Sequence, residues 1–472
     1  MLGIVLDKQS EQPLKRQLYV ALREQMISGT LKAGTPLPST RELAQVLNIS
    51  RNTVCEAYAM LLAEGYLNCR QGAATVVADN LCVQENTVAP REAAVTQPPI
   101  IANFQTGRPD VSLSPKSQWI KAMRSALEQL PAEEYGYTGP HGLKALRDEI
   151  ASFLYRVRGL RVCADDIFIT AGATHAIHLA AGIVKANGRA LLAEDPCHTG
   201  MLKTFHQSGC SVIPIPADSM GLMTEHLPND TTACCLYVTP SHQFPLGGIL
   251  PAARRAALIA YAREKSMYVI EDDYDSEFRY KGDPVAPLYA LDPHRVIYIG
   301  TFSKTLFPAL RIGFAVVPRI LQKLWMRFRT YSDVQNPPFE QAALAQLLQR
   351  RTLDKHIQKM RRVYGLRRDI LINALQASFQ DSCIPLGDAA GLHMAVRFPG
   401  MCFDTAFHKY CLAKGVFVTP AEYHSIQKGR YLDTLLLGFG HLTPEEIQRG
   451  IPLLEKAITT WRPSEARQNI TI

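Results

Sequence analysis

The sequence contains no apolar run long enough to cross a membrane. A membrane-spanning helix needs about 18 or more consecutive apolar residues. The longest candidate, residues 169–184, is shorter and includes His175 and His178. The first ten residues, MLGIVLDKQS, have no basic segment and no small-residue cleavage site, which argues against a signal peptide. We therefore expect a cytoplasmic protein with no membrane partner.

Paired cysteines and a large excess of one charge are also missing. The 11 cysteines form no C-x-x-C pair, which argues against a disulfide framework and a zinc site and fits a reducing compartment. The formal net charge of +8 over 472 residues is only a mild basic bias, compatible with a polyanionic partner. With 47% hydrophobic and 20% charged residues, the chain is neither disordered nor fibrous, and its length suggests two or three domains.

The first part of the chain, residues 1–78, predicts three helices followed by a hairpin. Apolar residues recur at helical spacing in residues 12–28, a Ser-x-x-Glu pattern at Ser39 marks the start of a second helix, and Ser50 can cap a third. Residues 66–77 alternate as a short hairpin would. This order of elements is that of a winged helix-turn-helix, a DNA-binding domain.

The remainder of the chain has a different texture. Residues 79–99 lack an apolar period and contain three prolines, which indicates a linker. From residue 100 onward, short β-rich segments alternate with helical stretches, which predicts a large α/β lobe with a parallel sheet. After about residue 318 the pattern indicates a smaller α+β lobe, so residues 100–472 form one large domain. The predicted strands of the large lobe lie in DDIFITAG, RALLAEDP, CSVIPIPA, CCLYVTP, SMYVIEDD, RVIYIGTFSK and IGFAVVP.

The third predicted helix opens with residues suited to DNA contact. Arg51, Asn52 and Thr53 would lie at its N-terminal end, which enters the major groove in helix-turn-helix proteins. Arginine pairs well with guanine and asparagine with adenine, and Arg41 is placed for a backbone phosphate. Residues 1–78 hold 8 Lys or Arg against 6 Asp or Glu. Charge alone therefore leaves a small helical domain that binds another protein equally open.

Sequence motifs favour DNA binding more strongly. The segments LPSTRELA, SRNTV and LLAEGYL resemble the GntR-type winged helix, and the likeness runs through almost all of residues 13–72. One departure is Ala74, at a wing position where the family commonly has glycine. The resemblance implies a double-stranded DNA operator as partner. The residues that would approach DNA are Arg41, Ser50, Arg51, Asn52, Thr53, Arg70 and Gly72.

A lysine and a group of acids in the large domain suggest a cofactor site. Lys304 follows an apolar strand, and a buried lysine has a lowered pKa and can form a Schiff base. On this segment alone, a lysine that extends its amine to the surface is the more frequent case. Residues 267–275 are an apolar strand that runs into four acidic side chains. Asp272 could face the pyridinium nitrogen of a pyridoxal ring, and Tyr274, on the same face of an extended chain, could reach its phenolic oxygen.

Other chemistry stays open for these acids, and two further features suggest an anion site. Paired acids could bind a metal or act on glycosides, although no histidine accompanies them at ligand spacing. The turn Gly172-Ala173-Thr174 opens an apolar helix with free backbone N–H groups, which suit a phosphate. Arg311 enters an apolar strand and needs an anion partner. Such turns are common in α/β folds, and Arg311 could equally form a structural ion pair.

Together these segments resemble the fold-type I aminotransferases. The segments VTPSHQFPLG, IEDDYDSEF and YIGTFSKTLFPALRIGF are similar to the MocR-type regulators, a GntR subfamily that fuses a winged helix to an aminotransferase-like domain. This resemblance covers roughly residues 10–460. It implies pyridoxal 5′-phosphate (PLP) as cofactor, with Lys304 as the Schiff-base lysine, Asp272 at the pyridinium nitrogen and Tyr274 at the phenolic oxygen. The residues implied near the phosphate are Gly172, Ala173, Thr174, Thr301, Ser303 and Arg311.

The resemblance also has consequences for the ring face and the effector. His198 stands where the family usually has a tyrosine stacked on the ring, and one side chain of residues 241–243 should lie near the ring. Two arginines that hold a carboxylate in the GABA-responsive member of the family are replaced by Gly200 and His441. A simple amino acid bound like an aminotransferase substrate is therefore disfavoured. His441, or another arginine such as Arg397, could contact an anion instead.

We therefore expect a PLP-dependent, DNA-binding transcriptional regulator that senses an amine or PLP itself. It is expected to use its aminotransferase-like domain for sensing rather than as an enzyme, with at most slow half-reactions. The resemblance implies a homodimer, and a head-to-tail exchange of the winged helices is one arrangement. Two rival hypotheses are an active aminotransferase with a vestigial winged helix and a protein-interaction scaffold that has lost PLP. The effector, the operator and the sign of regulation do not follow from the sequence.

Overall fold

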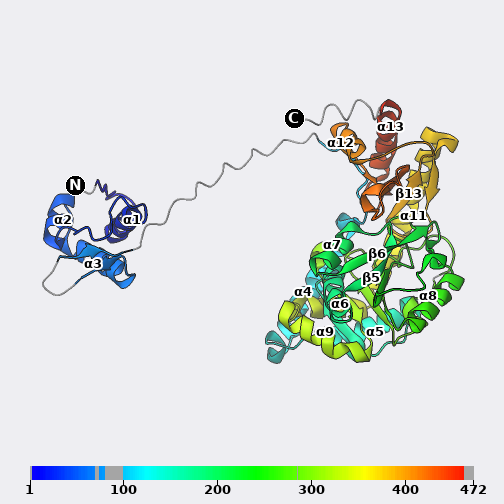
Figure 1. Cartoon of the computed structure of the whole chain (residues 1–472), viewed down its shortest axis with the longest axis horizontal. Helices are drawn as coiled ribbons and strands as arrows, with labels where there is room; N and C mark the ends of the chain where they lie inside the picture. The colour runs from blue at the N-terminus through cyan, green and yellow to red at the C-terminus, as the bar shows by residue number, and fades with distance from the viewer. Residues whose placement is uncertain (1–2, 70–73, 80–98, 284, 462–472) are drawn as a thin grey trace. The chain divides into compact units, whose positions relative to one another are not determined.

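The computed structural model divides the chain into two compact units, residues 1–95 and residues 96–472 (Figure 1). The predicted domain boundaries at residues 78 and 99 stay a prediction, because most of the segment between them is outside the described part. Arg70 and Gly72, two of the predicted DNA-contacting residues, are also outside it. The structure describes residues 3–69, 74–79, 99–283 and 285–461.

The first unit contains the three helices and the hairpin that the sequence predicts. Ser39 and Glu42 form a capping box at the start of α2, in which each side chain accepts a hydrogen bond from the other residue's backbone N–H. Ser50 caps α3 by accepting a hydrogen bond from the backbone N–H of Thr53 at 3.1 Å. The core consists of apolar side chains from all three helices and both strands. The elements are α1 (Leu14–Ile27), α2 (Thr40–Leu47), α3 (Arg51–Ala63), β1 (Leu67–Asn68) and β2 (Val76–Val77).

The second unit is built around a large mixed sheet. The predicted α/β fold is confirmed, but the expectation of a parallel sheet is wrong at its margins: β11 runs antiparallel to β10 and β4, and β7 runs antiparallel to β6. Only residues 302–312 connect β10 to β11, and a parallel return needs a crossover of about a dozen residues or more. In spatial order the strands are β4 (Ile167–Thr170), β11 (Gly313–Val316), β10 (Val296–Thr301), β9 (Tyr268–Asp273), β8 (Cys235–Val238), β5 (Ala190–Asp195), β6 (Ser211–Asp218) and β7 (Gly221–Leu222).

Helices cover both faces of this sheet, which is why its strands are apolar on both sides. Side chains that alternate along the strands belong to two separate apolar clusters: Ile297 and Ile299 to one, and Val296 and Tyr298 to the other. On the first face lie α6 (Ala173–Ala186), α7 (Thr199–Gln207) and α9 (Arg319–Ser332). On the second face lie α4 (Lys116–Gln129), α5 (Lys144–Arg158), α8 (Ala252–Glu264) and α10 (Pro338–Gln349).

The smaller part of the second unit is the α+β lobe that the sequence predicts. Its four-stranded antiparallel sheet has the order β12-β13-β16-β15, and β14 pairs in parallel with β3, far earlier in the chain. The elements are β3 (Ala102–Asn103), α11 (Thr352–Phe379), β12 (Ile384–Leu386), β13 (His393–Arg397), α12 (Thr405–Ala413), β14 (Val416–Phe417), β15 (Thr419–Pro420), β16 (Thr434–Gly438) and α13 (Pro444–Thr460).

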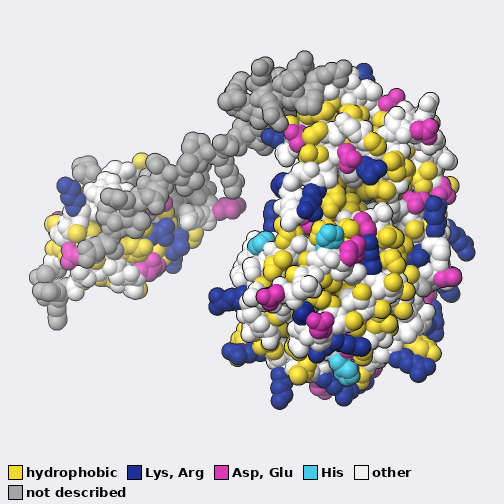
Figure 2. Space-filling view, turned by 45° about the vertical axis from the view of Figure 1, so that its right-hand side comes forward, with side chains coloured by type: hydrophobic (Ala, Val, Ile, Leu, Met, Phe, Trp, Pro, Cys, Tyr) yellow, Lys and Arg dark blue, Asp and Glu magenta, His cyan; other side chains and the backbone are white. Residues whose placement is uncertain are grey.

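The surface agrees with the mild charge bias of the sequence. In the view of Figure 2, Lys and Arg side chains are spread around the rim of the second unit rather than gathered into one patch. Within the described residues, no helix combines the length and the apolarity that crossing a membrane requires.

Candidate functional site

A cavity of about 220 Å³ lies where β9 and β10 end, at the edge of the large sheet. All of the predicted cofactor residues except Gly172 line it. Gly172 lies directly beside it, because a Cβ at this position would be 3.1 Å from the Arg311 guanidinium. The predicted residues in the lining are Ala173, Thr174, His198, Asp272, Tyr274, Thr301, Ser303, Lys304 and Arg311.

Lys304 reaches the cavity from the loop that follows β10. Its Nζ donates a hydrogen bond to the backbone carbonyl of Gly107 at 2.5 Å. Burial lowers the pKa of the Lys304 amine, and the nearby Asp275 and Asp272 carboxylates act in the opposite direction. The burial effect is the largest, so the amine loses its proton more readily than a surface lysine does.

The acids around the end of β9 have separate partners. Glu271 accepts hydrogen bonds from the backbone N–H groups of Leu288 and Tyr289 at 2.8 and 2.9 Å. Asp273 forms a buried ion pair with Arg158 at 3.0 Å. Asp275 lies 3.1 Å from His242. These three acids do not line the cavity, so the fourth, Asp272, is the acid of this strand that is available to a ligand there.

Asp272 keeps one oxygen free. Its Oδ2 accepts a hydrogen bond from the Tyr237 hydroxyl at 2.7 Å, whereas its Oδ1 is buried and has no hydrogen-bond partner among the described residues. Burial raises the pKa of Asp272 to about 6. A buried acceptor without a donor is costly, and a cationic N–H group in the cavity would satisfy it. Sequence reasoning missed Tyr237, although a tyrosine within a buried apolar strand signals a hidden hydrogen-bond partner.

Another part of the cavity lining is suited to an anion. The helix α6 begins after Gly172, whose φ of 84° favours glycine and whose lack of a side chain leaves the first N–H groups of the helix uncapped. Arg311 lies beside this turn and donates a hydrogen bond to the Ala171 carbonyl at 2.6 Å. Thr301 and Ser303, whose hydroxyls are 3.0 Å apart, add further donors.

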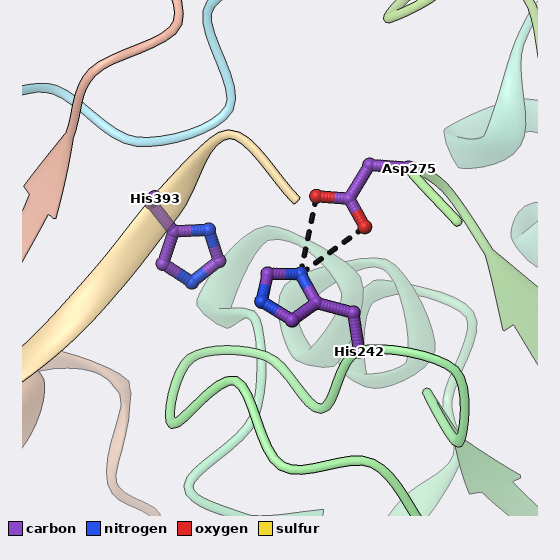
Figure 3. Close-up of side chains that lie close together, drawn as sticks. All are labelled: His242, Asp275 and His393. Carbon is purple, nitrogen blue, oxygen red and sulfur yellow. Dashed lines mark hydrogen bonds and ion pairs between the residues drawn. The ribbon is translucent and has the colours of Figure 1, made fainter. Parts of the chain in front are cut away.

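The hydroxyl of Tyr274 contacts a buried histidine, His242. This hydroxyl lies 3.0 Å from both the His242 carbonyl and the His242 Nδ1. The same Nδ1 lies 3.1 Å from each Asp275 oxygen, as Figure 3 shows. His393, from β13, packs against the His242 ring and contacts the Pro245 carbonyl through its Nε2. Ligand atoms of His242, Asp275 and His393 lie within 4.8 Å of one another, a spacing that could hold a metal ion. The expectation of no metal site stays a prediction.

The structure also shows which residues of the 239–248 loop reach the cavity. None of the side chains of residues 241–243, one of which was expected near the ring, lines it; Thr239 and Phe244 do. Ser241 accepts a hydrogen bond from Arg158 at 2.9 Å, and Gln243 donates hydrogen bonds to the backbone carbonyls of Pro196 and Phe244, both at 2.8 Å. Sequence reasoning also missed other lining residues, which carry no charge to mark them: Thr106, Gly107, Met201 and Pro308.

A second, larger cavity of about 620 Å³ adjoins the first and shares His198 and Thr106 with it. The His198 Nδ1 accepts a hydrogen bond from the Gly200 backbone N–H at 3.1 Å and so caps α7. A Cβ at Gly200 would lie only 3.0 Å from this imidazole, so a larger residue there would disturb the ring. Neither His441 nor Arg397, the suggested anion contacts, lines either cavity.

The predicted DNA contacts of the first unit lie at its surface. At the start of α3, Arg51 and Asn52 are exposed and Thr53 is half-buried, while the following turns bury Val54 against the core. Arg41 is exposed in the first turn of α2. The N-terminal turn of α3 therefore presents polar side chains, as major-groove contact requires.

The raised pKa of Asp272 predicts a stability effect. Between about pH 4 and 6 the unfolded carboxyl ionises while the folded one stays protonated, so stability falls as pH rises through this window. Without a cofactor, Asp272→Asn should therefore raise the free energy of unfolding at pH 7, by on the order of 2 kcal/mol. Urea unfolding at pH 4 and pH 7 measures this. An equal effect of the substitution at both pH values would contradict it, and Asp381→Asn, at an exposed site, is the control.

Comparisons with known proteins agree with this geometry. Residues 99–449 match the family model "Aminotransferase class I and II", and residues 14–77 match "Bacterial regulatory proteins, gntR family". Among solved structures, an archaeal alanine:glyoxylate aminotransferase matches with a TM-score of 0.72 and 26% identity, covering 78% of this chain and 91% of the other. The Pyrococcus horikoshii kynurenine aminotransferase, solved with PMP, matches with a TM-score of 0.71 and 27% identity, covering 77% and 91%.

Curated relatives share both units. "Probable rhizopine catabolism regulatory protein MocR" of Rhizobium meliloti is 31% identical over 98% of this chain and 97% of its own length. The "HTH-type pyridoxine biosynthesis transcriptional regulator PdxR" of Corynebacterium glutamicum is 36% identical over 79% of this chain and 81% of its own. The chain therefore belongs to the MocR-type regulators, GntR-family transcriptional regulators that carry an aminotransferase-like domain.

Proposed function

We propose that this regulator binds PLP covalently through Lys304 and changes its action on DNA when an amine effector or PLP itself occupies the second unit. The observation that carries the proposal is the unpaired, buried Oδ1 of Asp272, in the same cavity as Lys304. A pyridinium N–H would complete this acceptor. The PMP-bound aminotransferase of the same fold supports the choice of cofactor.

The residues of the cavity match the parts of PLP. Asp272 would pair with the ring nitrogen, Tyr274 would contact the phenolic oxygen and His198 would lie against the ring. The Lys304 amine would condense with the aldehyde and release one water molecule. When bound, PLP supplies an electron-withdrawing ring next to that linkage. The donors left for the phosphate are the N-terminus of α6 at Gly172, Ala173 and Thr174, together with Thr301, Ser303 and Arg311.

The larger cavity is the proposed place of the effector. His424 accepts hydrogen bonds at Nδ1 from Thr199, as His198 does from Gly200. Burial lowers the pKa of His198 to about 4 and that of His424 to about 3, so both rings are neutral at pH 7. A neutral imidazole whose Nδ1 accepts carries its proton on Nε2. Both rings therefore offer an N–H donor, and with Lys203 in the lining they suit an acidic group on the effector.

The first unit is proposed to read the operator through α3. Arg51 and Asn52 would contact base edges, and Arg41 and the α3 N-terminus at Ser50 would contact phosphates. Arg70 and Gly72 are proposed wing contacts. A homodimer is the proposed form, because large apolar side chains are exposed on the second unit. They lie on α4, on residues 132–137 and on α9: Ile120, Tyr135, Tyr137, Ile320 and Tyr331.

Lys304→Ala should abolish covalent cofactor binding. Without the amine, PLP can be held only through its phosphate and ring contacts. Borohydride reduction followed by peptide mass analysis should find a pyridoxyl group on Lys304 of the wild-type protein and none in the variant. Lys409→Ala, which removes an exposed lysine, should behave as wild type. A wild-type protein without a reducible lysine adduct after reconstitution would disprove the cofactor assignment.

Arg51→Ala should abolish selective operator binding and leave PLP binding intact. A bidentate contact to a base is worth about 1–3 kcal/mol of discrimination. Fluorescence anisotropy with an operator and a scrambled duplex measures both affinity and selectivity. The control Lys32→Ala removes an exposed charge from the same unit. If the Arg51 variant keeps the selectivity of the wild type, α3 is not the helix that reads the operator.

Sustained transamination of common amino acids should be absent or very slow. Fast turnover needs the substrate held at a fixed angle to the ring, and such positioning can contribute several kcal/mol, up to about 7–11. By the resemblance, Gly200 and His441 occupy the two positions at which the GABA-responsive relative has carboxylate-binding arginines. Steady-state keto-acid production from a panel of L- and D-amino acids tests this. Multiple rapid turnovers would establish instead the active aminotransferase that the fold also allows.

A further inference from the structure

A third cavity, of about 700 Å³, lies where the start of α4 meets the start of α11. It shares no lining residue with the two cavities around Lys304. Three lysines line it: Lys116 from α4, and Lys355 and Lys359 from α11. No acid is among the described lining residues, and the nearby Asp354 is paired with Arg156 at 3.2 Å. The cavity is therefore positively charged and has no internal counter-ion.

The α4 N-terminus adds backbone donors to this charge. This helix of 14 residues starts after Pro115 with no side-chain cap. Among the described residues, no backbone carbonyl accepts from the N–H groups of Ser117 or Gln118, which belong to the first turn. Unpaired N–H groups at a helix N-terminus attract anions. Like the lysines, these N–H groups therefore favour a negatively charged ligand.

His356 is an independent sign of a ligand site. Its side chain lines the cavity, yet only 8% of its surface is exposed. No hydrogen bond or ion pair joins it to another described residue. A buried imidazole normally has a partner, and its pKa is lowered to about 4 by burial and by Lys359, so it is neutral at pH 7. It then offers one N–H donor to whatever fills the cavity.

We propose that this cavity binds the phosphate group of a small molecule. A phosphate dianion has several acceptor oxygens and calls for more than one cation, which matches the lysines of α11, the neutral His356 donor and the α4 N-terminus. A single carboxylate would leave part of this donor set unused. The proposal does not depend on PLP binding.

Residues in or beside the lining of this cavity also contact the loop that carries Lys304. The Ser114 hydroxyl donates a hydrogen bond to the Leu306 carbonyl at 3.3 Å, and the Trp119 ring packs edge-on against Phe307 at 5.5 Å. Both contacts come from residues at the start of α4 or just before it. A ligand held there restrains the 304–311 loop, and Trp119 reports its binding.

The test is a titration of the full-length protein with inorganic phosphate, by calorimetry and tryptophan fluorescence. The protein is first loaded with PLP so that the cavity beside Lys304 is filled, unbound PLP, which carries a phosphate of its own, is removed by gel filtration, and chloride keeps the ionic strength constant. The wild type should bind phosphate saturably. The double variant Lys355→Gln/Lys359→Gln should weaken binding at least about tenfold. His356→Phe should also weaken it, and His356→Gln, which restores an N–H donor, should recover part of the affinity.

A matched control and the thermal unfolding of each variant exclude indirect effects. Lys121→Gln removes an exposed charge from the same helix, outside the cavity, and should leave phosphate binding unchanged. Absence of saturable binding, or equal binding by the double variant, would overturn the proposal. It would equally be overturned if phosphate had no effect while the double variant lost affinity for duplex DNA. That result would assign the lysines to the DNA backbone.

Discussion

The burial of Asp272 beside Lys304 is the constraint on which the site depends. The strands β9 and β10 are parallel, with Asp272 opposite Ile299, so the acid at the end of one strand and the lysine after the other meet at the same edge of the sheet. Burial disfavours the charged form of both groups. Within the described structure, no ion pair of 4 Å or less joins the Asp272 carboxylate to the Lys304 amine. A ligand that offers a cationic N–H to the acid and an aldehyde to the amine would relieve both.

The acids near Asp272 have partners of their own, which leaves Asp272 as the acid that faces the cavity. Four carboxyl groups within residues 271–275 would repel one another strongly in a buried region. The fold gives Glu271 two backbone N–H groups, Asp273 a guanidinium and Asp275 an imidazole. Each of these partners comes from a different part of the chain. Among the described residues, Asp272 accepts only from the neutral Tyr237 hydroxyl. Its carboxylate would therefore be stabilised by a positively charged group in the cavity.

His198 and Gly200 are structurally coupled where the two cavities meet. Gly200 leaves room for the His198 ring, and the Gly200 N–H fixes the His198 Nδ1 as an acceptor. Any side chain at position 200 would place its Cβ 3.0 Å from the imidazole, so the ring would have to shift by a few tenths of an ångström and the two positions depend on each other. The neutral imidazoles of His198 and His424 both line the larger cavity.

Features that depend on neighbouring residues could be predicted from the sequence. The caps at Ser39 and Ser50, the strands of the large sheet and the glycine turn at Gly172 each follow from a few consecutive side chains. The group of cofactor residues could be predicted as well, because the motifs around Lys304 and Asp272 resemble a known family. The structure brings these residues to one cavity, as that resemblance implies.

Features that depend on residues far apart in the chain were decided only by the tertiary structure. The reversed direction of β11, the Tyr237–Asp272 hydrogen bond and the packing of His393 on His242 all join separate segments. The third cavity, which three lysines line, is formed between α4 and α11, and α11 follows more than 200 residues later in the chain. Local sequence determines which element forms and which side chains it carries. Which of those side chains share a buried space depends on how the strands are ordered and paired, because only packing brings distant groups within hydrogen-bond range.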